Sequence, residues 1–319
     1  MRAGTGQAWP NLGGASVFLI FAALLFSSQL ALAQFSQQGP KLVGTGAVGP
    51  AYQGYSVSLS ADGNSAIVGG WSDNSGQGAA WIFTRSGGTW TQQGSKLVGT
   101  GAVGGAIQGW SVALSADSNT AIVGGLGDNS NAGATWVYTR SGDAWTQQGS
   151  KLVGTGAVGA AAQGSSVALS ADGNTAIVGG LADNLNTGAA WVYARSGTVW
   201  TQQGNKLIGT GAVGNAGHGV SVALSADGST AIVGGVEGNS YIGAAWVYSR
   251  SGAVWAQQGN KLAGTDAVGS ARQGHSVALS ADGSTAIVGG LADNRVTGAA
   301  WAYTRSGGAW TTPAQHLGF

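Results

Sequence analysis

A unit of 55 residues repeats five times along this chain, and this repeat constrains the fold more than any other feature. The pattern Lys-Leu-x-Gly-Thr occurs once in each unit and begins at Lys41, Lys96, Lys151, Lys206 and Lys261. A tryptophan recurs with the same period, at Trp90, Trp145, Trp200, Trp255 and Trp310. Such a repeat indicates that one supersecondary unit stacks on copies of itself, because a single unit cannot bury its own hydrophobic face.

Each unit has the pattern of four antiparallel strands. In the second unit the β-prone runs are residues 111–115, 120–123, 134–140 and 145–153. Residues 116–119 form a turn between the first two runs, and Ser141-Gly142 forms a turn between the last two. No helical period accompanies them. Because a four-stranded all-β repeat has the size of a propeller blade, the sequence predicts an all-β fold, a five-bladed β-propeller.

The composition favours a packed core. The 60 Gly residues alone would suggest low complexity, but 13 Trp and 43% hydrophobic residues contradict a disordered chain. We expect Ala and Gly to fill the inner strands, and Trp81, Trp90 and their repeats to fill the wider space between outer strands. A solenoid is the competing fold, but it needs capping repeats, and the first and last units resemble the middle ones.

The sequence predicts one propeller domain, residues 34–319, after a signal peptide, residues 1–33. Its units are approximately residues 54–104, 109–159, 164–214, 219–269 and 274–319. Residues 34–44 match the outer strand of every unit, whereas the last unit's own version contains Pro313, which cannot donate to a strand ladder. We therefore expect residues 34–44 to close the ring. Five units are either a complete small propeller or a partial one that closes by association.

The first residues have the features of a signal peptide. Arg2 precedes an apolar stretch at residues 17–25, and Ala31-Leu32-Ala33 fits the small-x-small pattern that signal peptidase recognises. A membrane anchor is the alternative, but polar residues 27–29 interrupt the apolar run before it reaches the roughly 20 residues of a spanning helix. We expect cleavage before Gln34, a mature chain without a membrane span, and a secreted, cell-surface or periplasmic location.

One 17-residue pattern, Gly-x-Ser-Val-Ala-Leu-Ser-Ala-Asp-Gly-x-Thr-Ala-Ile-Val-Gly-Gly, is clearest at Gly164–Gly180 and Gly274–Gly290. Together with the Gly-Ala-Ala-Trp that follows, it resembles the FG-GAP repeat family, whose units build the integrin α-chain propeller and many exported bacterial proteins. The resemblance covers nearly all of the mature chain and implies a binding or adhesion propeller. Gln53-Gly54 and its repeats replace the family's Phe-Gly, Gly69-Gly70-Trp71 and its repeats replace Gly-Ala-Pro, and integrin propellers have seven blades.

The resemblance also raises the question of calcium, because integrin-like units often carry several Asp or Asn between the first two strands. Here that turn offers one carboxylate per unit, Asp62, Asp117, Asp172, Asp227 or Asp282. Calcium takes about six to eight oxygen ligands, so we predict no metal and no cofactor. Asp73-Asn74 and its repeats should hold their own loops through backbone hydrogen bonds, with a weak cation site as the alternative. Arg85 and its repeats should pair with the Asp turns.

Several classes of function lack support in the sequence. A formal charge of +1 gives no field to gather nucleic acid. There is no Cys, and the three histidines, His218, His275 and His316, are scattered along the sequence outside any catalytic motif. A glycoside hydrolase with an axial pocket remains the enzymatic alternative. Its carboxylates would come from Asp143, Glu237 and Asp266, the acids that occur only once among the repeated positions.

A comparison of the five units locates a candidate binding surface. The loop entering the first strand and the loop between the second and third strands vary most, and alternating strands place both on one side of the disc. The unusual residues in these loops are Tyr52, Tyr55, Trp71, Trp110, Arg272, His275 and Arg295. Ring closure would join them in one asymmetric patch. We expect a non-enzymatic module that recognises a glycan or an extracellular protein surface, as a monomer unless the ring is incomplete; drift of exposed loops and a structural repeat without a dedicated ligand are the alternatives.

Overall fold

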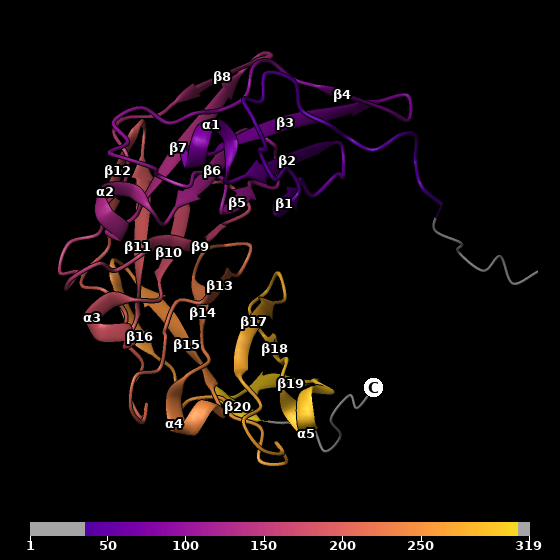
Figure 1. Cartoon of the computed structure of the whole chain (residues 1–319). Coiled ribbons are helices and arrows are strands. Elements are labelled where there is room, and N and C mark those ends of the chain that lie inside the picture. The colour runs from indigo at the N-terminus through magenta and orange to yellow at the C-terminus, as the bar shows by residue number, and fades with distance from the viewer. Residues whose placement is uncertain (1–35, 312–319) are drawn as a thin grey trace, which may run out of the picture. The chain divides into compact units, whose positions relative to one another are not determined.

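The computed structural model describes residues 36–311, and these fold into five four-stranded sheets (Figure 1). The first is β1 (Ser56–Leu59), β2 (Ser65–Gly70), β3 (Ala79–Ser86) and β4 (Thr89–Gln92). The second is β5 (Ser111–Leu114), β6 (Thr120–Gly125), β7 (Ala134–Ser141) and β8 (Ala144–Gln147). The third is β9 (Gln163–Leu169), β10 (Thr175–Gly180), β11 (Ala189–Ser196) and β12 (Val199–Gln202). The fourth is β13 (Ser221–Leu224), β14 (Thr230–Gly235), β15 (Ala244–Ser251) and β16 (Val254–Gln257). The fifth is β17 (Gln273–Leu279), β18 (Thr285–Gly290), β19 (Ala299–Ser306) and β20 (Ala309–Thr311).

The strands of every sheet lie in chain order and are antiparallel. This is the predicted blade topology, so the all-β class and the five four-stranded units are confirmed and fit a five-bladed propeller. The fourth strand is shorter than expected, since β8 ends at Gln147. The residues after it form a connector, in which Leu152 pairs with Thr135 through an isolated bridge.

Between the second and third strands of each sheet lies a one-turn segment. These are α1 (Asp73–Gly76), α2 (Asp128–Asn131), α3 (Asp183–Asn186), α4 (Gly238–Tyr241) and α5 (Asp293–Val296). Their inner residues have left-handed backbone angles; Asn184 and Leu185, for instance, have φ values of 48° and 57°. Such angles cost a residue with a side chain about 1–2 kcal/mol, which explains why Asn is frequent here.

The core lies between neighbouring sheets. The central Ala-Ile-Val run of each second strand is β-prone, and β2, β6, β10 and β14 are buried along their whole length. The predicted packing role of Trp81 is confirmed, because its indole is fully buried. Gly44 and Gly70 leave room for that indole, since a β-carbon at either position would lie within 3 Å of it. Trp90 is only half-buried.

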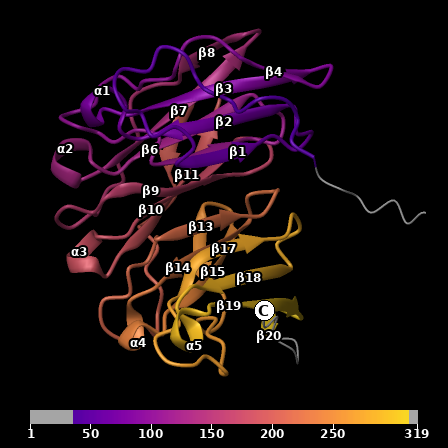
Figure 2. The same ribbon diagram turned by 45° about the vertical axis from the view of Figure 1, so that its right-hand side comes forward.

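The fifth sheet takes its fourth strand from its own unit, because β20 pairs with β19 in the register Arg305↔Trp310. Residues 36–44 contain no strand. Ring closure through residues 34–44 is thus not seen among the described residues and stays a prediction. In both views β17 follows directly on the fourth sheet, and it contacts β13 and β14 (Figures 1 and 2).

The expected signal peptide, residues 1–33, lies outside the described residues, as do residues 312–319, including Pro313 and His316. Over residues 36–311, none of the helices has both the length and the apolar character that a membrane crossing requires.

Candidate functional site

Four aromatic side chains from the first two sheets form one cluster, which we call the aromatic cluster: Tyr52, Tyr55, Trp71 and Trp110. The rings of Tyr52 and Trp71 are stacked, with centroids 5.2 Å apart and planes 14° apart. Tyr55 lies 4.6 Å from Trp110 and 6.2 Å from Trp71, and the two indoles are 6.2 Å apart. The structure thus brings together the four aromatic residues that the sequence comparison singled out.

The loops on either side of the first two strands hold this cluster. Tyr52 has a left-handed backbone, with φ of 52°, and its carbonyl accepts a hydrogen bond from the Tyr55 N–H, so a tight turn presents both rings. Trp71 follows directly after β2, on the same side of the sheet. Both tyrosines remain exposed, by 62% and 50%, and partial burial raises the pKa of the Tyr55 phenol. The cluster is therefore a rigid aromatic surface open to solvent.

The three remaining candidate residues, Arg272, His275 and Arg295, form a separate group on the fifth sheet, which we call the basic group. All three are exposed. The Arg272 guanidinium lies 5.4 Å from the centre of the Tyr241 ring, a cation–π contact with the fourth unit. Arg272 and Arg295 line an open hollow of about 540 Å³ together with Leu291. The structure does not bring this group into contact with the aromatic cluster, so the predicted single patch appears as two parts.

The carboxylates of the loop segments do something other than the predicted bonding of their own loop. The buried Asp73 accepts a hydrogen bond from the Val48 N–H, at 2.7 Å, and forms an ion pair with Lys96. Asp128 binds Val103 and Lys151 in the same way, and Asp183 binds Val158 and Lys206. Each carboxylate therefore ties two connector segments to the sheet, with one oxygen bonded to a backbone N–H and the other to a lysine. Sequence reasoning missed this because the partners lie 25 residues upstream and 23 downstream.

The Asp turns hold their own backbone. Asp62 accepts hydrogen bonds from the Ser60 hydroxyl and from the backbone and side chain of Asn64, which keep the pKa of its carboxyl at about 2. The expected pairing of the Arg residues with these turns is seen in part, because Arg195 interacts electrostatically with Asp172, although its hydrogen bond goes to the neighbouring Asn. Arg195 donates to Asn174 Oδ1, at 2.9 Å, and stacks on Trp200. Within residues 36–311 no group of three His, Cys, Asp or Glu side chains is arranged for a metal ion.

His218 is the one buried histidine among the described residues. It stands where the other units have a glutamine such as Gln163, whose Oε1 accepts from the Gly154 N–H. In His218 the Nε2 atom accepts from the Gly209 N–H, so the proton is on Nδ1 and is donated to the Thr187 carbonyl at 3.0 Å. Burial lowers the pKa of this imidazole. Its role is to hold a connector.

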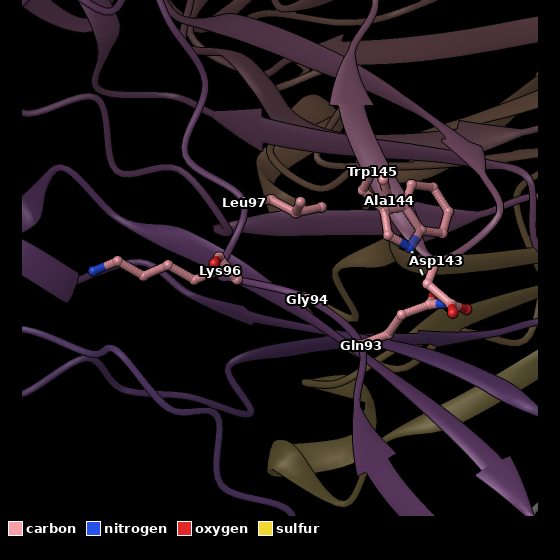
Figure 3. A pocket seen from close by; sticks show the side chains of 8 residues that line it. Gln93, Gly94, Lys96, Leu97, Asp143, Ala144 and Trp145 are labelled. Atoms are coloured by element: carbon pink, nitrogen blue, oxygen red, sulfur yellow. Dashed lines mark hydrogen bonds between the residues drawn. The ribbon is translucent and has the colours of Figure 1, made fainter.

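The three acids considered for hydrolysis have separate surroundings. An open hollow of about 460 Å³ lies between the first two sheets. There Gln93 donates to Asp143 and accepts from the Trp145 indole (Figure 3). Lys96 points away from this hollow (Figure 3). Asp266 accepts from the Trp301 indole at 2.7 Å, and Glu237 precedes α4. Asp143 thus belongs to the second unit, whereas Glu237 and Asp266 both belong to the fourth and have different neighbours.

Comparison with known proteins gives similarity of fold only. No family model matches the sequence, and no curated protein matches it either. A protein of unknown function from Desulfotomaculum acetoxidans has a TM-score of 0.53 at 13% identity, over 81% of this chain and 68% of that one. A TolB-like protein from Agrobacterium tumefaciens gives 0.47 at 12% identity, over 81% and 79% of the two chains. Hydrazine synthase from Kuenenia stuttgartiensis gives 0.48 at 13% identity, over 87% and 69%.

Proposed function

We propose that this protein is an exported, non-enzymatic recognition module that binds a glycan through the loop side of its sheets. The observation that carries this proposal is the aromatic cluster, in which the rings of Tyr52, Tyr55, Trp71 and Trp110 contact one another while both tyrosines stay exposed. Exposed aromatic groups of this size are uncommon on a surface without a partner.

The chemistry of the cluster favours a sugar. A pyranose ring presents an apolar C–H face that can stack on an aromatic ring, while its hydroxyls remain free to bond at the edge. Tyr52, Tyr55 and the two indoles carry O–H and N–H groups at their rims, which suits such a ligand. The aromatic side chains are also held by neighbouring rings, so little side-chain entropy is lost on binding.

The proposal includes three further points. The first is that the five sheets belong to a closed propeller ring, in which the fifth sheet of a chain packs against a first sheet, either its own or that of another copy. The second is export by a signal peptide at residues 1–33. The third is kinship with FG-GAP repeat proteins, which the 17-residue pattern supports and which implies adhesion. Asp143 lies in a different unit from Glu237 and Asp266, and Asp143 and Asp266 are each hydrogen-bonded to a neighbouring side chain, so a hydrolase is not favoured.

The test is a screen of the purified protein on an array of neutral, carboxylated and sulfated oligosaccharides. We expect binding that the double substitution Trp71→Ala/Trp110→Ala abolishes. The matched control is Trp200→Ala, which removes a half-buried tryptophan from an outer strand far from the loops. Glycan binding that survives the double substitution, or capture of an extracellular protein without any glycan signal, would contradict the proposal.

A further inference from the structure

The five sheets pack on one another through four copies of the same interface. Ile67 and Ile82 of the first sheet lie in one core cluster with Leu114 of the second. The Ala61 N–H donates to the Ala116 carbonyl at 3.2 Å, and the same bond recurs at 3.0, 2.8 and 2.8 Å along the series Ala116, Ala171, Ala226 and Ala281. The Ser56 hydroxyl donates to the Gly109 carbonyl, and its repeats do likewise.

The two ends of the series leave the two halves of this interface uncovered. On the leading face of the first sheet, Val57 and Leu59 are 67% and 60% exposed, whereas Val112 and Leu114 of the second sheet are 8% and 7% exposed. On the trailing face of the fifth sheet, Ile287 is 42% exposed, whereas its counterparts at Ile67, Ile122, Ile177 and Ile232 are fully buried.

Among the described residues, two hydrogen-bond donors of the repeated interface also lack an acceptor at the trailing face of the fifth sheet. Within residues 36–311 the Ala281 N–H and the Ser276 hydroxyl have no acceptor, although the four preceding repeats all have one. An open hollow of about 430 Å³ lies there, lined by His275, Ser276 and Ala300 among others. Apolar surface and unpaired donors together indicate a face that is built to be covered.

We infer that a second copy of this chain covers these faces, with the trailing face of one copy packed on the leading face of the next. The two faces are complementary because they are the two halves of an interface that forms four times within the chain. Within one chain Val57 and Ile287 both stay exposed, so the occupant is another copy. The contact is heterologous, and it continues until the assembly closes into a ring or extends as a filament.

This association completes the proposed binding surface, and to that extent the inference rests on the proposed function. Tyr55 and Trp110 occupy equivalent positions of neighbouring sheets and lie 4.6 Å apart; His275 occupies that position in the fifth sheet. The same spacing places His275 of one copy against Tyr55 of the next. The Ile107 N–H donates to the Gly76 carbonyl, so the equivalent bond places Val296, and with it Arg295, beside Tyr52 of the next copy.

In the completed surface, one copy supplies the aromatic cluster and the other supplies the guanidinium groups of Arg272 and Arg295. Arginine binds carboxylate and sulfate groups in a bidentate manner. The ligand class that fits both parts is an acidic glycan, with a sugar face on the aromatic cluster and an acidic substituent at Arg272 or Arg295.

A disulfide test exploits the absence of cysteine from the chain. Ala61→Cys and Ala281→Cys are prepared as separate single variants and mixed under mild oxidation. Both positions are exposed, and backbone atoms of the equivalent internal pairs lie within hydrogen-bond distance, so a disulfide can span them. We expect a linked dimer in the mixture and much less in either variant alone. An unlinked mixture, or an intramolecular disulfide in the double variant without dimers, overturns the inference.

Mass measurements by light scattering give a second test. We expect the purified protein to have at least twice the mass of one chain, and Ile287→Lys to convert it to a monomer. Val254→Lys is the matched control, because Val254 is 68% exposed on an outer strand away from both end faces, and its mass should equal that of the wild type. A monomeric wild type, or an Ile287→Lys assembly of unchanged mass, contradicts the inference.

The array screen separates the two proposals. We expect Ile287→Lys and Arg295→Gln to lose at least tenfold in signal on carboxylated and sulfated glycans. Association without any glycan binding would refute the proposed function and leave the second copy in place. Glycan binding by a monomer would refute the second copy and leave the function in place, and a preference for neutral glycans would refute the acidic ligand.

Discussion

The rings of Tyr55 and Trp110 lie 4.6 Å apart although 55 residues, one whole repeat, separate them. Equivalent positions of neighbouring sheets therefore meet on the loop side, so a residue at this position serves two units at once. Because the other units have Ser165, Val220 and His275 there, the aromatic surface is confined to one end of the series. A repetitive scaffold thus carries one asymmetric aromatic surface.

The contact predicts coupling between the two rings in ligand binding. Trp110→Ala and Tyr55→Ala should each weaken glycan binding by about 1–3 kcal/mol, as expected for aromatic anchors. The double variant should lose less than the sum of the two, because each ring holds the other in place. Titration calorimetry of the four proteins with the best ligand from the array measures this. Additive losses would show that the rings act independently, and wild-type affinity in both single variants would remove the aromatic cluster from the site.

The buried His218 predicts a loss of stability in acid. Burial lowers the pKa of its imidazole in the folded protein, whereas the unfolded chain has the ordinary value of 6.5. The stability that the neutral imidazole contributes is therefore present above pH 6.5 and is lost as the pH falls from there toward the folded pKa, because the unfolded state binds the proton first.

His218→Gln is the matched control, because other units have a glutamine at the equivalent position, such as Gln108 and Gln163, which bonds its connector in the same way. Urea unfolding at pH 7.5 and pH 5 should show a larger drop in the unfolding free energy for the wild type than for the variant. Equal drops in the two proteins would mean that His218 does not carry the acid sensitivity.

The Asp–Lys pairs predict that a connector lysine contributes to the stability of the folded protein only in the units where it pairs with a buried aspartate. Lys206→Met should lower the unfolding free energy by about 1–3 kcal/mol, because it leaves the fully buried Asp183 without its counter-charge. This is less than the cost at a fully buried pair, since Lys206 is partly exposed.

The fourth unit offers a natural control for this effect. There Gly238 stands in the place of the aspartate, so Lys261→Met removes a lysine without a partner carboxylate, and its unfolding free energy should change by less than about 0.5 kcal/mol. Thermal or urea unfolding of both variants measures the difference. Equal effects of the two substitutions would show that the methylene stem, and not the ion pair, matters.

The local parts of this fold could be predicted from the sequence because they depend on neighbours in the chain. The Asp62 turn, the strand order and the burial of Trp81 all follow from residues within one unit. Asp73 was misinterpreted because its partners, Val48 and Lys96, come from connectors that only the folded sheet brings to it. A carboxylate beside an Asn gives no local sign of such partners.

The state of the two end faces could not be predicted for a different reason. The first and fifth units have nearly the same sequence as the middle ones, so Ile287 looks like a core residue in the sequence. Its 42% exposure depends on whether another sheet follows the fifth. The sequence of a repeat specifies how one unit packs on the next, but not what meets the last one.

The left-handed segments predict a gain in stability at one exposed leucine. Leu185 has φ of 57° and is 83% exposed, so its side chain contributes little burial while its backbone is strained. Leu185→Gly should raise the unfolding free energy by up to about 1 kcal/mol, because glycine adopts this angle without steric cost and that relief exceeds its extra entropy in the unfolded chain. Leu185→Ala is the control: it removes the same apolar group but keeps the β-carbon, so its stability should stay near that of the wild type. Urea midpoints of the three proteins measure the effect, and an equal or lower midpoint for the glycine variant would mean that the segment stores no such strain.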